Sequence, residues 1–255
     1  MEVPNLSTDM PNPLVAKLRP LAENYAAQRG GHAYKALGAG GSAAVFHASI
    51  NEQPRALKVY SPEFFDEHNA PAERRRVELQ RQLIGHQCVP LVGFHDIVEE
   101  AGTCFIEMEF VAWPTLKDVC ENVPPAAIVG IMAQLVEAVR FLESKGIVHR
   151  DIKPENILIS ADFTELKLID LGVAREMSGD EDAVDATDHS GRRPFIATAQ
   201  YSSPEYLFRL EAPSPAMWQA LTIYQLGGVL HDLVMRRQLF DAEVMTGNKF
   251  NVAAA

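Results

Sequence analysis

Apolar and polar positions along the chain predict two differently built parts. Residues 33–60 read as three short strands, and residues 91–97 and 103–110 read as a hairpin across the turn at 99–102. A helical stretch at 71–84 lies between these two groups of strands. From Pro124 onward helical spacing dominates, beginning with an amphipathic run that ends near Gly146. The pattern therefore predicts an α+β fold, with a small strand-rich part followed by a larger helix-rich part.

The amino-terminal stretch differs from both parts. Residues 1–30 are irregular and contain several prolines, and their pattern predicts a short helix at 14–28. They carry no recognisable chemistry, so we expect a flexible or loosely docked tail.

Residues 149–156, His-Arg-Asp-Ile-Lys-Pro-Glu-Asn, hold the most informative polar cluster. Asp151 is placed to accept a proton from an attacking hydroxyl group. Lys153 projects to the same side of an extended loop, where it can neutralise charge on a phosphoryl group. Asn156 offers a neutral oxygen to a magnesium ion. This spacing is what phosphoryl transfer requires, although a polar loop can contain the same residue types by chance.

Three further motifs occur in an order that fits the same chemistry. An apolar strand ends in Asp170-Leu-Gly, which places a carboxylate where it can bind a divalent cation. A glycine-rich turn at 37–45 lets backbone N–H groups approach phosphate oxygens. The strand that follows carries Lys58, a cation that is costly to bury unless it is paired with a phosphate or a carboxylate.

Taken together, these motifs resemble a eukaryotic-type protein kinase domain over residues 33–241. The phrase at 197–205, Ala-Thr-Ala-Gln-Tyr-Ser-Ser-Pro-Glu, is similar to a segment of Ser/Thr kinases and is closest in wording to bacterial members. The resemblance implies a two-lobed kinase-like fold. Residues 1–30 are then an extension, 31–111 the amino-terminal β lobe, and 112–255 a carboxy-terminal α lobe that lacks its last helices.

The resemblance also implies a set of site residues, with ATP and Mg²⁺ as the small-molecule partners. The catalytic group is Asp151, Lys153, Lys58, Glu78 and Thr198. The nucleotide-binding group is Leu37, Gly38, Gly40, Val45, Ala56, Lys58, Met108, Glu109, Val111 and Leu158. The metal ligands are Asn156 and Asp170.

Two glutamates of the predicted helix at 71–84 are candidates for the carboxylate partner of Lys58. The number of residues between the glutamate and His86 favours Glu78, but Gln82 then stands where the family has an apolar packing residue. Glu73 has the apolar Val77 at that offset but lies farther from the next strand. We choose Glu78. Either glutamate also fits an exposed pair with a neighbouring arginine, worth only ~0.3–0.5 kcal/mol.

Substrate class and regulation follow from the resemblance. Lys153 is typical of Ser/Thr kinases, so the acceptor is a Ser or Thr hydroxyl of a protein. Arg150 belongs, in the family, to a basic pocket for a phosphorylated activation segment, and Ser190 has the spacing of an autophosphorylation site. The acidic residues at 179–188 suggest a second hypothesis, that carboxylates mimic phosphate at Arg150. A solvated acidic loop is the alternative.

Two departures from the family pattern bear on activity. Thr222 stands where the family has an aspartate that hydrogen-bonds the loop at 149–156, which is the catalytic loop of the family. We therefore expect this loop to be less rigid here. The chain ends at Ala255, before the helices that supply an arginine partner for Glu205. Arg209, Arg236 or Arg237 are the substitutes that the sequence offers.

Composition and charge argue against several classes of binding partner. The 23 basic and 34 acidic residues argue against a general nucleic-acid binder. Cys88, Cys104 and Cys120 form no Cys-x-x-Cys pair, which favours reduced thiols over a zinc site or a disulfide scaffold. The apolar stretch at 126–142 contains charged residues, so we expect a core helix, no membrane segment, and a cytoplasmic protein.

Two functions from different classes remain. The first is an ATP- and magnesium-dependent protein serine/threonine kinase, with autophosphorylation included. The second is a pseudokinase-like module that binds nucleotide or a partner without turnover, which the short carboxy-terminal lobe and Thr222 suggest. No Gly-x-x-x-x-Gly-Lys-Ser/Thr loop occurs, which excludes a P-loop ATPase.

Overall fold

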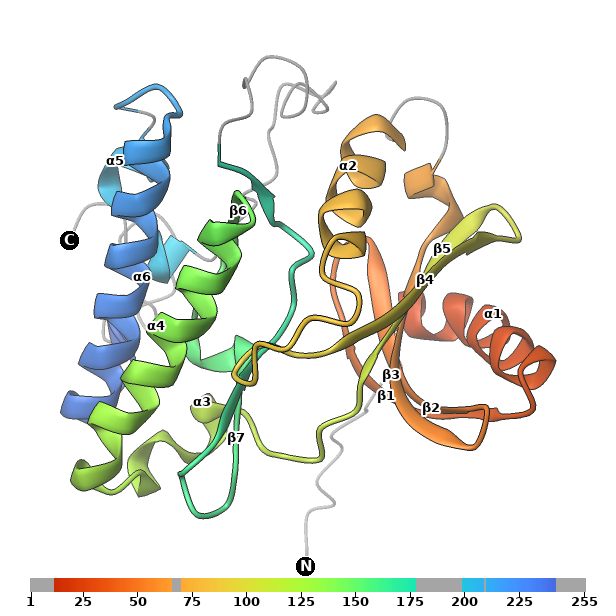
Figure 1. Ribbon diagram of the computed structural model, residues 1–255, viewed down its shortest axis with the longest axis horizontal. Helices are drawn as coiled ribbons and strands as arrows, with labels where there is room; N and C mark the ends of the chain where they lie inside the picture. Colours follow the sequence, from red (N-terminus) through yellow and green to blue (C-terminus); the bar gives the residue numbers. More distant parts are fainter. Residues whose placement is uncertain (1–11, 66–69, 178–198, 209, 242–255) are drawn as a thin grey trace, which may run out of the picture. The chain divides into compact units, whose positions relative to one another are not determined.

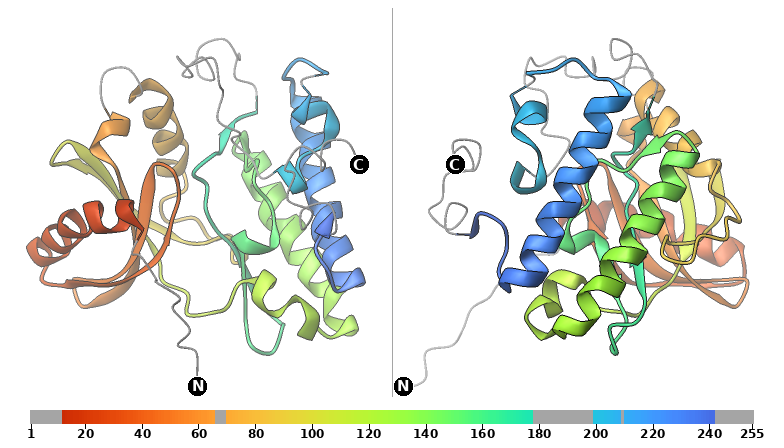
Figure 2. Two further views of the ribbon diagram at one scale, coloured as in Figure 1. Left: turned by 180° about the vertical axis from the view of Figure 1, so that it is seen from behind. Right: turned by 60° about the vertical axis from the view of Figure 1, so that its left-hand side comes forward.

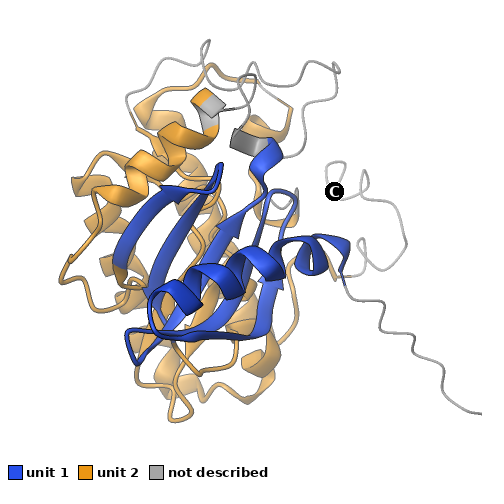
Figure 3. Ribbon diagram, turned by 90° about the vertical axis from the view of Figure 1, so that its right-hand side faces the viewer, with its two compact units in different colours: residues 1–67, 95–110 blue, residues 68–94, 111–255 orange. Residues whose placement is uncertain are grey.

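A computed structural model describes residues 12–65, 70–177, 199–208 and 210–241. The chain forms two compact units, which Figure 3 shows in separate colours. The first unit contains Met1–Glu67 and His95–Phe110, and the second contains His68–Phe94 and Val111–Ala255. The helix predicted at 71–84 therefore belongs to the same unit as the later helices.

The first unit is built on a five-stranded sheet with the order β1-β2-β3-β5-β4. The pairs β1–β2, β2–β3 and β3–β5 are antiparallel (Figure 1), as the alternating pattern predicts. The strands are β1 (His32–Ala39), β2 (Ala43–Ile50), β3 (Gln53–Tyr60), β4 (Phe94–Glu100) and β5 (Thr103–Glu109), and the short helix η1 (Pro62–Phe65) follows β3.

Two-residue turns set the register of two of these hairpins. Asn51 and Glu52 join β2 to β3 with φ angles of 48° and 64°, and Ala101 and Gly102 join β4 to β5 with 53° and 73°. Left-handed conformations at both turn positions match the right-handed twist of antiparallel strands. The predicted hairpin across 99–102 is confirmed.

Helix α1 (Pro13–Gln28) packs on the sheet of the first unit. Asn12 caps its first turn by accepting a hydrogen bond from the Leu14 N–H group, at 2.9 Å. Its apolar side packs against alternate residues of β2. Figures 1 and 3 show the helix lying along the sheet. The buried contacts include Leu18, Ala22, Tyr25, Ala44, Phe46, Ala48 and Ile50.

The prediction of a loosely docked tail is wrong for α1. The Tyr25 ring stacks on Phe105 with centroids 4.3 Å apart, and its hydroxyl donates a 2.7 Å hydrogen bond to Glu107 on β5. Arg29 pairs with Glu100 at 3.2 Å. The helical spacing was recognised in the sequence, but the face that it covers is a property of the folded sheet.

The second unit is mainly helical. Its longest helices, α4 and α6, lie side by side and run in opposite directions (Figures 1 and 2). A short hairpin, β7–β8, and a separate two-stranded antiparallel sheet, β6–β9, complete it. Its helices are α2 (Ala70–Arg81), α3 (Leu116–Val119), α4 (Ile128–Ser144), α5 (Pro204–Leu207), α6 (Pro215–Met235), η2 (Cys120–Asn122), η3 (Pro125–Ala127), η4 (Pro154–Asn156) and η7 (Ala199–Tyr201), and its short strands are β6 (Ile147–Val148), β7 (Ile157–Ile159), β8 (Leu166–Leu168) and β9 (Arg175–Glu176).

Among the described residues one helical segment, Pro125–Ser144, is long and apolar enough to cross a membrane. This is weak evidence by itself, because the core helix of a folded domain has the same length and composition. In the second unit Ile131, Leu135, Ala138 and Leu142 of this segment are buried.

Candidate active site

The catalytic loop of the second unit holds the Asp151 carboxylate between two side chains. Its Oδ2 atom accepts a hydrogen bond from Asn156 Nδ2 at 2.9 Å and lies 2.7 Å from Lys153 Nζ. The short helix η4 turns the chain back, so Asn156 also donates to the Asp151 carbonyl oxygen at 2.8 Å. The loop therefore brings together three of the predicted residues around one carboxylate oxygen.

The two predicted metal ligands flank the β7–β8 hairpin. Asn156 precedes β7 and Asp170 follows β8, and the Ile169 N–H group donates to the Asn156 carbonyl oxygen at 2.9 Å. Asp170 has a φ angle of 62°, and its Oδ1 accepts a hydrogen bond from the Gly172 N–H group at 3.1 Å. The hairpin thus places these two oxygen-bearing side chains at the same end.

This pair fits a magnesium site. Mg²⁺ prefers oxygen ligands and takes only one or two carboxylates from the protein, with substrate phosphates and water in the other positions. Both hydrogen bonds of the Asn156 side chain use its nitrogen, which leaves the carboxamide oxygen for the ion. Among the residues that the structure describes, no group of three or more His, Cys, Asp or Glu side chains forms an all-protein metal site.

His149 connects the catalytic loop to the strand end before Asp170. Its Nδ1 atom accepts from the Asp151 N–H group at 3.3 Å, and Nε2 lies 3.0 Å from the Ile169 carbonyl oxygen. An N–H group only donates and a carbonyl only accepts, so Nε2 carries the proton and the ring is neutral. Burial lowers the pKa of His149, in agreement with this charge state.

Arg150 is buried beside the same loop. Its Nη2 donates a 2.6 Å hydrogen bond to the Tyr206 hydroxyl, and its guanidinium lies 5.2 Å from the Trp218 ring centroid. Arg175 lies 4.6 Å from the same centroid. Two cations therefore gather at one indole ring, in a setting that suits an anionic group.

Several predicted features lie outside the described residues. These are Thr198, the phosphorylation candidate Ser190, the acidic stretch 179–188 that was expected at Arg150, and Arg209. Arg236, another candidate partner for Glu205, instead donates to the carbonyl oxygens of Cys120 and Glu121, at 3.1 and 3.0 Å. Glu205 itself is exposed on α5.

Helix α6 contacts the catalytic loop through a residue that the sequence did not single out. Thr222 is buried, as expected for that position, but the contact is made by Gln225. Its Nε2 donates to the Arg150 carbonyl oxygen at 2.8 Å, and its Oε1 accepts from the Ile152 N–H group at 3.3 Å. The sequence led us to expect a less rigid loop, and the structure shows that α6 contacts the loop through Gln225. The available signal was a carboxamide one turn after Thr222 on a mainly apolar helix.

The end of the segment before α5 is also anchored on α6. The Tyr201 hydroxyl donates to Asp232 at 2.5 Å, and the Leu239 N–H group donates to the same carboxylate at 2.6 Å. Burial raises the pKa of Asp232 above its ordinary value, and these hydrogen bonds act in the opposite direction. A Cβ atom on Gly228 would lie 2.9 Å from the Tyr201 ring, so glycine permits this close approach.

Four of the predicted nucleotide residues of the first unit share one face of its sheet. Lys58 is paired in register with Val45 on β2, and Ala56 is paired with Met108 on β5. Opposed residues of antiparallel strands point to the same side, and so do residues two apart along a strand. The intervening residues Phe46, Leu57 and Phe105 belong to the core cluster under α1. The sheet therefore brings together Val45, Ala56, Lys58 and Met108 on the face opposite α1.

The other predicted nucleotide residues are more scattered. Leu37 and Gly38 lie on β1 where its register with β2 shifts, and Gly40 donates from its N–H group to the Ala43 carbonyl oxygen at 2.9 Å. Glu109 ends β5. Val111 and Leu158 belong to the second unit, where Leu158 is half-buried on β7.

Helix α2 presents its two glutamates to different surroundings. The Glu78 side chain is 63% exposed and pairs with Arg81 at 3.2 Å. The Glu73 side chain is only 9% exposed and forms an ion pair with Arg76 on the same helix. Burial therefore argues against Glu78, the residue chosen from the sequence, and in favour of Glu73 for a buried ion pair.

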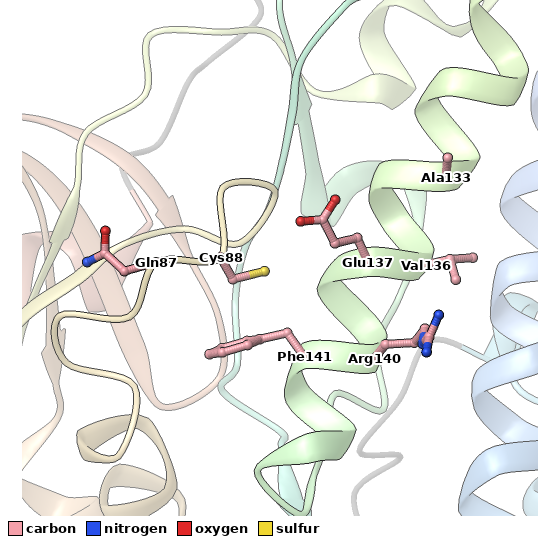
Figure 4. A pocket seen from close by; sticks show the side chains of 7 residues that line it. All are labelled: Gln87, Cys88, Ala133, Val136, Glu137, Arg140 and Phe141. Carbon is pink, nitrogen blue, oxygen red and sulfur yellow. The ribbon is translucent and has the colours of Figure 1, made fainter.

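A pocket lies on the surface of the second unit, between α4 and the loop after α2 (Figure 4). It has a volume of about 580 Å³ and contains none of the predicted site residues. Its lining consists of Gln87, Cys88, Ala133, Val136, Glu137, Arg140 and Phe141. Burial raises the pKa of the Cys88 thiol, which disfavours a reactive thiolate there.

Comparison with known proteins agrees with this geometry. Residues 32–254 match the family model described as protein kinase domain. Three similar proteins are serine/threonine-protein kinases. PknA of Corynebacterium glutamicum is 29% identical over 81% of this chain and 43% of its own length. PknH of Mycobacterium tuberculosis is 30% identical over 79% of this chain and 30% of its own length, and PrkC of Bacillus subtilis is 30% identical over 82% of this chain and 31% of its own length. The chain thus spans less than half the length of these relatives. The match over most of the chain shows that it belongs to the protein kinase domain family.

Proposed function

We propose that this chain is a protein serine/threonine kinase, which transfers the γ-phosphoryl group of ATP to Ser or Thr hydroxyls, including its own. The proposal rests on one observation. Asp151 Oδ2 lies within hydrogen-bonding distance of both Lys153 and Asn156, in a loop tied to the hairpin that leads to Asp170. This is the arrangement that phosphoryl transfer to a hydroxyl group needs.

The residues of the second unit take the following roles. The acceptor hydroxyl oxygen forms a bond to the γ-phosphorus while the bond from that phosphorus to the β–γ bridging oxygen breaks, and ADP leaves with the electron pair. Asp151 receives the hydroxyl proton. Lys153 stabilises the charge on the transferred group. A magnesium ion held by Asn156 and Asp170 supplies further charge neutralisation at the phosphates when it is bound.

The residues of the first unit would bind the nucleotide. Val45, Ala56 and Met108 give the sheet face opposite α1 an apolar surface suited to a base. Lys58 is 7% exposed on the same face, where a buried cation is best compensated by phosphate or carboxylate oxygens. The family membership supports this assignment.

We also assign to Glu73, in place of Glu78, the ion-pair role that the sequence predicted for α2. Its carboxylate is the buried one of the two. A buried charge is retained only when it is paired, whereas an exposed pair such as Glu78–Arg81 contributes little.

Transfer of labelled phosphate from ATP and magnesium to a generic basic protein tests the proposed function. Asp151→Asn keeps the shape of the loop but removes the proton acceptor, and we expect the rate to fall by roughly 100-fold or more. Asp96→Asn is the matched control, because Asp96 is exposed on β4 and its Oδ1 accepts only from the neighbouring Ile97 N–H group, at 2.8 Å.

Two outcomes would contradict the proposal. Transfer that survives Asp151→Asn would show that another group, or a contaminant, performs the reaction. Thermal stabilisation by ATP and magnesium, without transfer by the wild type, would support a nucleotide-binding module instead.

A further inference from the structure

The side chain of Gln225 is buried at the centre of the second unit. Gln225 lies on α6 and is 1% exposed. Its carboxamide uses both its ends on the catalytic loop, since Nε2 donates to the Arg150 carbonyl oxygen and Oε1 accepts from the Ile152 N–H group. A buried carboxamide is costly unless it is hydrogen-bonded, so the position of this side chain depends on that of the loop.

The two bonded groups belong to the two peptide units on either side of Asp151. The Arg150 carbonyl is part of the peptide unit before the Asp151 Cα atom, and the Ile152 N–H group is part of the one after it. A single rigid amide group therefore connects both peptide planes that determine the Asp151 backbone angles. Because the side chain leaves from the same Cα atom, this connection also fixes the direction of the Cα–Cβ bond, while Lys153 and Asn156 contact the carboxylate itself.

The remaining polar groups of these two peptide units are also hydrogen-bonded. The Asp151 N–H group donates to His149 Nδ1 at 3.3 Å, and the Asp151 carbonyl oxygen accepts from Asn156 Nδ2 at 2.8 Å. His149 and Asn156 are themselves part of the loop. Gln225 is the partner that comes from a long helix outside it, so it relates the loop to the rigid body of the unit.

The loop also needs such support, because Arg150 has a φ angle of 71°. A left-handed conformation is unfavourable for a non-glycine residue and persists only where the surroundings hold it. The hydrogen bond from Gln225 acts on the carbonyl of this residue.

We propose that Gln225 is a positioning residue for the kinase reaction, which orients Asp151 through the peptide units on both of its sides. This inference rests on the proposed function. Gln225 touches neither nucleotide nor acceptor. It supplies, from a different position of α6, the support that the family pattern assigns to an aspartate where this chain has Thr222.

Gln225→Met tests the proposal because it keeps the length of the side chain and removes both hydrogen bonds. Misplacement of a reacting group by about 1 Å can cost up to ~100-fold in rate. We expect kcat for phosphate transfer to fall roughly 10- to 100-fold, while KM for ATP changes less than about threefold. A smaller folded fraction would also lower the apparent kcat without changing KM, so kcat is calculated per folded molecule, with the folded fraction measured by circular dichroism. A lower kcat per folded molecule at nearly unchanged KM then indicates positioning.

Gln134→Met is the matched control. The Gln134 side chain on α4 makes the same two kinds of bond, donating to the Thr164 carbonyl oxygen at 2.8 Å and accepting from the Leu166 N–H group at 3.2 Å. It contacts the turn end of the β7–β8 hairpin, which is the end opposite Asn156 and the catalytic loop. We expect a change in melting temperature for Gln134→Met but a kcat within about twofold of the wild type.

Gln225→Glu gives an independent test of the proposal. It serves as the deciding test if the Gln225→Met variant does not fold. An ionised carboxylate accepts from Ile152 but cannot donate to the Arg150 carbonyl, whereas a protonated carboxyl does both. Burial raises the pKa of an introduced carboxyl group. The rate of this variant, divided by the wild-type rate at each pH so that ionisations common to both proteins cancel, should therefore rise as the pH is lowered from 8 to 6.

The results separate this proposal from the proposed function. A wild type that transfers phosphate, with a folded Gln225→Met variant of equal kcat or a flat rate ratio for Gln225→Glu, would overturn the role of Gln225 alone. A wild type without transfer would overturn the proposed function, and the role of Gln225 with it.

Discussion

His149 illustrates how burial and hydrogen bonding together determine the charge of one side chain. The motif at 149–156 names the residue but not its protonation state. In the folded chain its ring lies between an obligatory donor at Asp151 and an obligatory acceptor at Ile169, so only the neutral tautomer with a proton on Nε2 satisfies both. The ring then connects Asp151, the proposed proton acceptor, to the strand end that carries Asp170, the proposed metal ligand.

This environment predicts a stability that depends on pH. Burial lowers the pKa of His149 from its ordinary value of 6.5, so the unfolded chain binds a proton at a higher pH than the folded chain does. The free energy of unfolding should therefore fall as the pH drops below about 6.5, and stay level above it as far as this residue is concerned. Urea denaturation between pH 5 and 8 measures the slope.

His149→Asn identifies the contribution of this ring. The pKa values of His47 and His95 are also lowered, mainly by burial, and give a slope of the same sign that remains in the variant. We expect a smaller fall on acidification than in the wild type. An unchanged slope would mean that His149 titrates as an ordinary histidine.

Within the catalytic loop, sequence separation decides which contacts were predictable. Asp151, Lys153 and Asn156 lie within six positions of one another, and their roles followed from spacing alone. Gln225 lies 75 residues from Arg150, and no local pattern relates the two. Its contact exists because α6 packs its buried side against the loop.

Helix α2 shows the corresponding limit for a whole element. Its helical pattern was recognised, but Glu73 and Glu78 are five residues apart and so point in directions that differ by about 140°. A sequence with charged residues on most sides of the helix does not reveal which direction is buried. In the folded chain the Glu73 side chain is buried and the Glu78 side chain is exposed.

The two glutamates of α2 therefore form a matched pair for mutation. Glu73→Gln removes a buried charge, and we expect the phosphate-transfer rate to fall roughly 10-fold or more. Glu78→Gln removes only an exposed pair with Arg81, worth ~0.3–0.5 kcal/mol, and the rate should stay within about twofold of the wild type. Steady-state kinetics of both variants would contradict the assignment if Glu78→Gln had the larger effect.

Helix α1 differs from its expected behaviour for a physical reason. Its apolar spacing shows that one side seeks burial, but a sheet face to cover it forms only when β1, β2 and β3 assemble. Leu18, Ala22 and Ala26 are fully buried, and Tyr25 nearly so, in the first unit. The helix therefore stabilises the sheet from the side opposite Lys58.

Truncation of one α1 side chain tests how firmly the helix is docked. Leu18→Ala should lower the free energy of unfolding by roughly 2–5 kcal/mol, the usual cost of removing a fully buried leucine side chain. Leu210→Ala is the control, since Leu210 is 68% exposed and the same change there should cost under about 0.5 kcal/mol. Equal effects in thermal or urea unfolding would mean that α1 is loosely attached.

For the molecule as a whole, the order of strand-rich and helix-rich parts was predictable, and the division into two units follows it closely. Residues 70–94 are the exception, because they lie between strands in the sequence but belong to the helical unit. A helix joins the unit that buries its apolar side, whatever its neighbours in the chain. Arg75 of α2 pairs with Glu176 of β9 at 2.6 Å within that unit.

The proposed chemistry of this protein was predictable from short stretches of its sequence, because phosphoryl transfer requires particular groups at short, regular separations. Asp151, Lys153, Asn156 and Asp170 were recognised for that reason. Their support was not, because a polar group buried in a core takes whichever partner packing brings to it. Local spacing in the sequence thus predicted the catalytic loop at 149–156. Burial decided the rest, namely the support of this loop by Gln225, the neutral state of His149 and the choice of Glu73. Burial arises only when distant segments pack together.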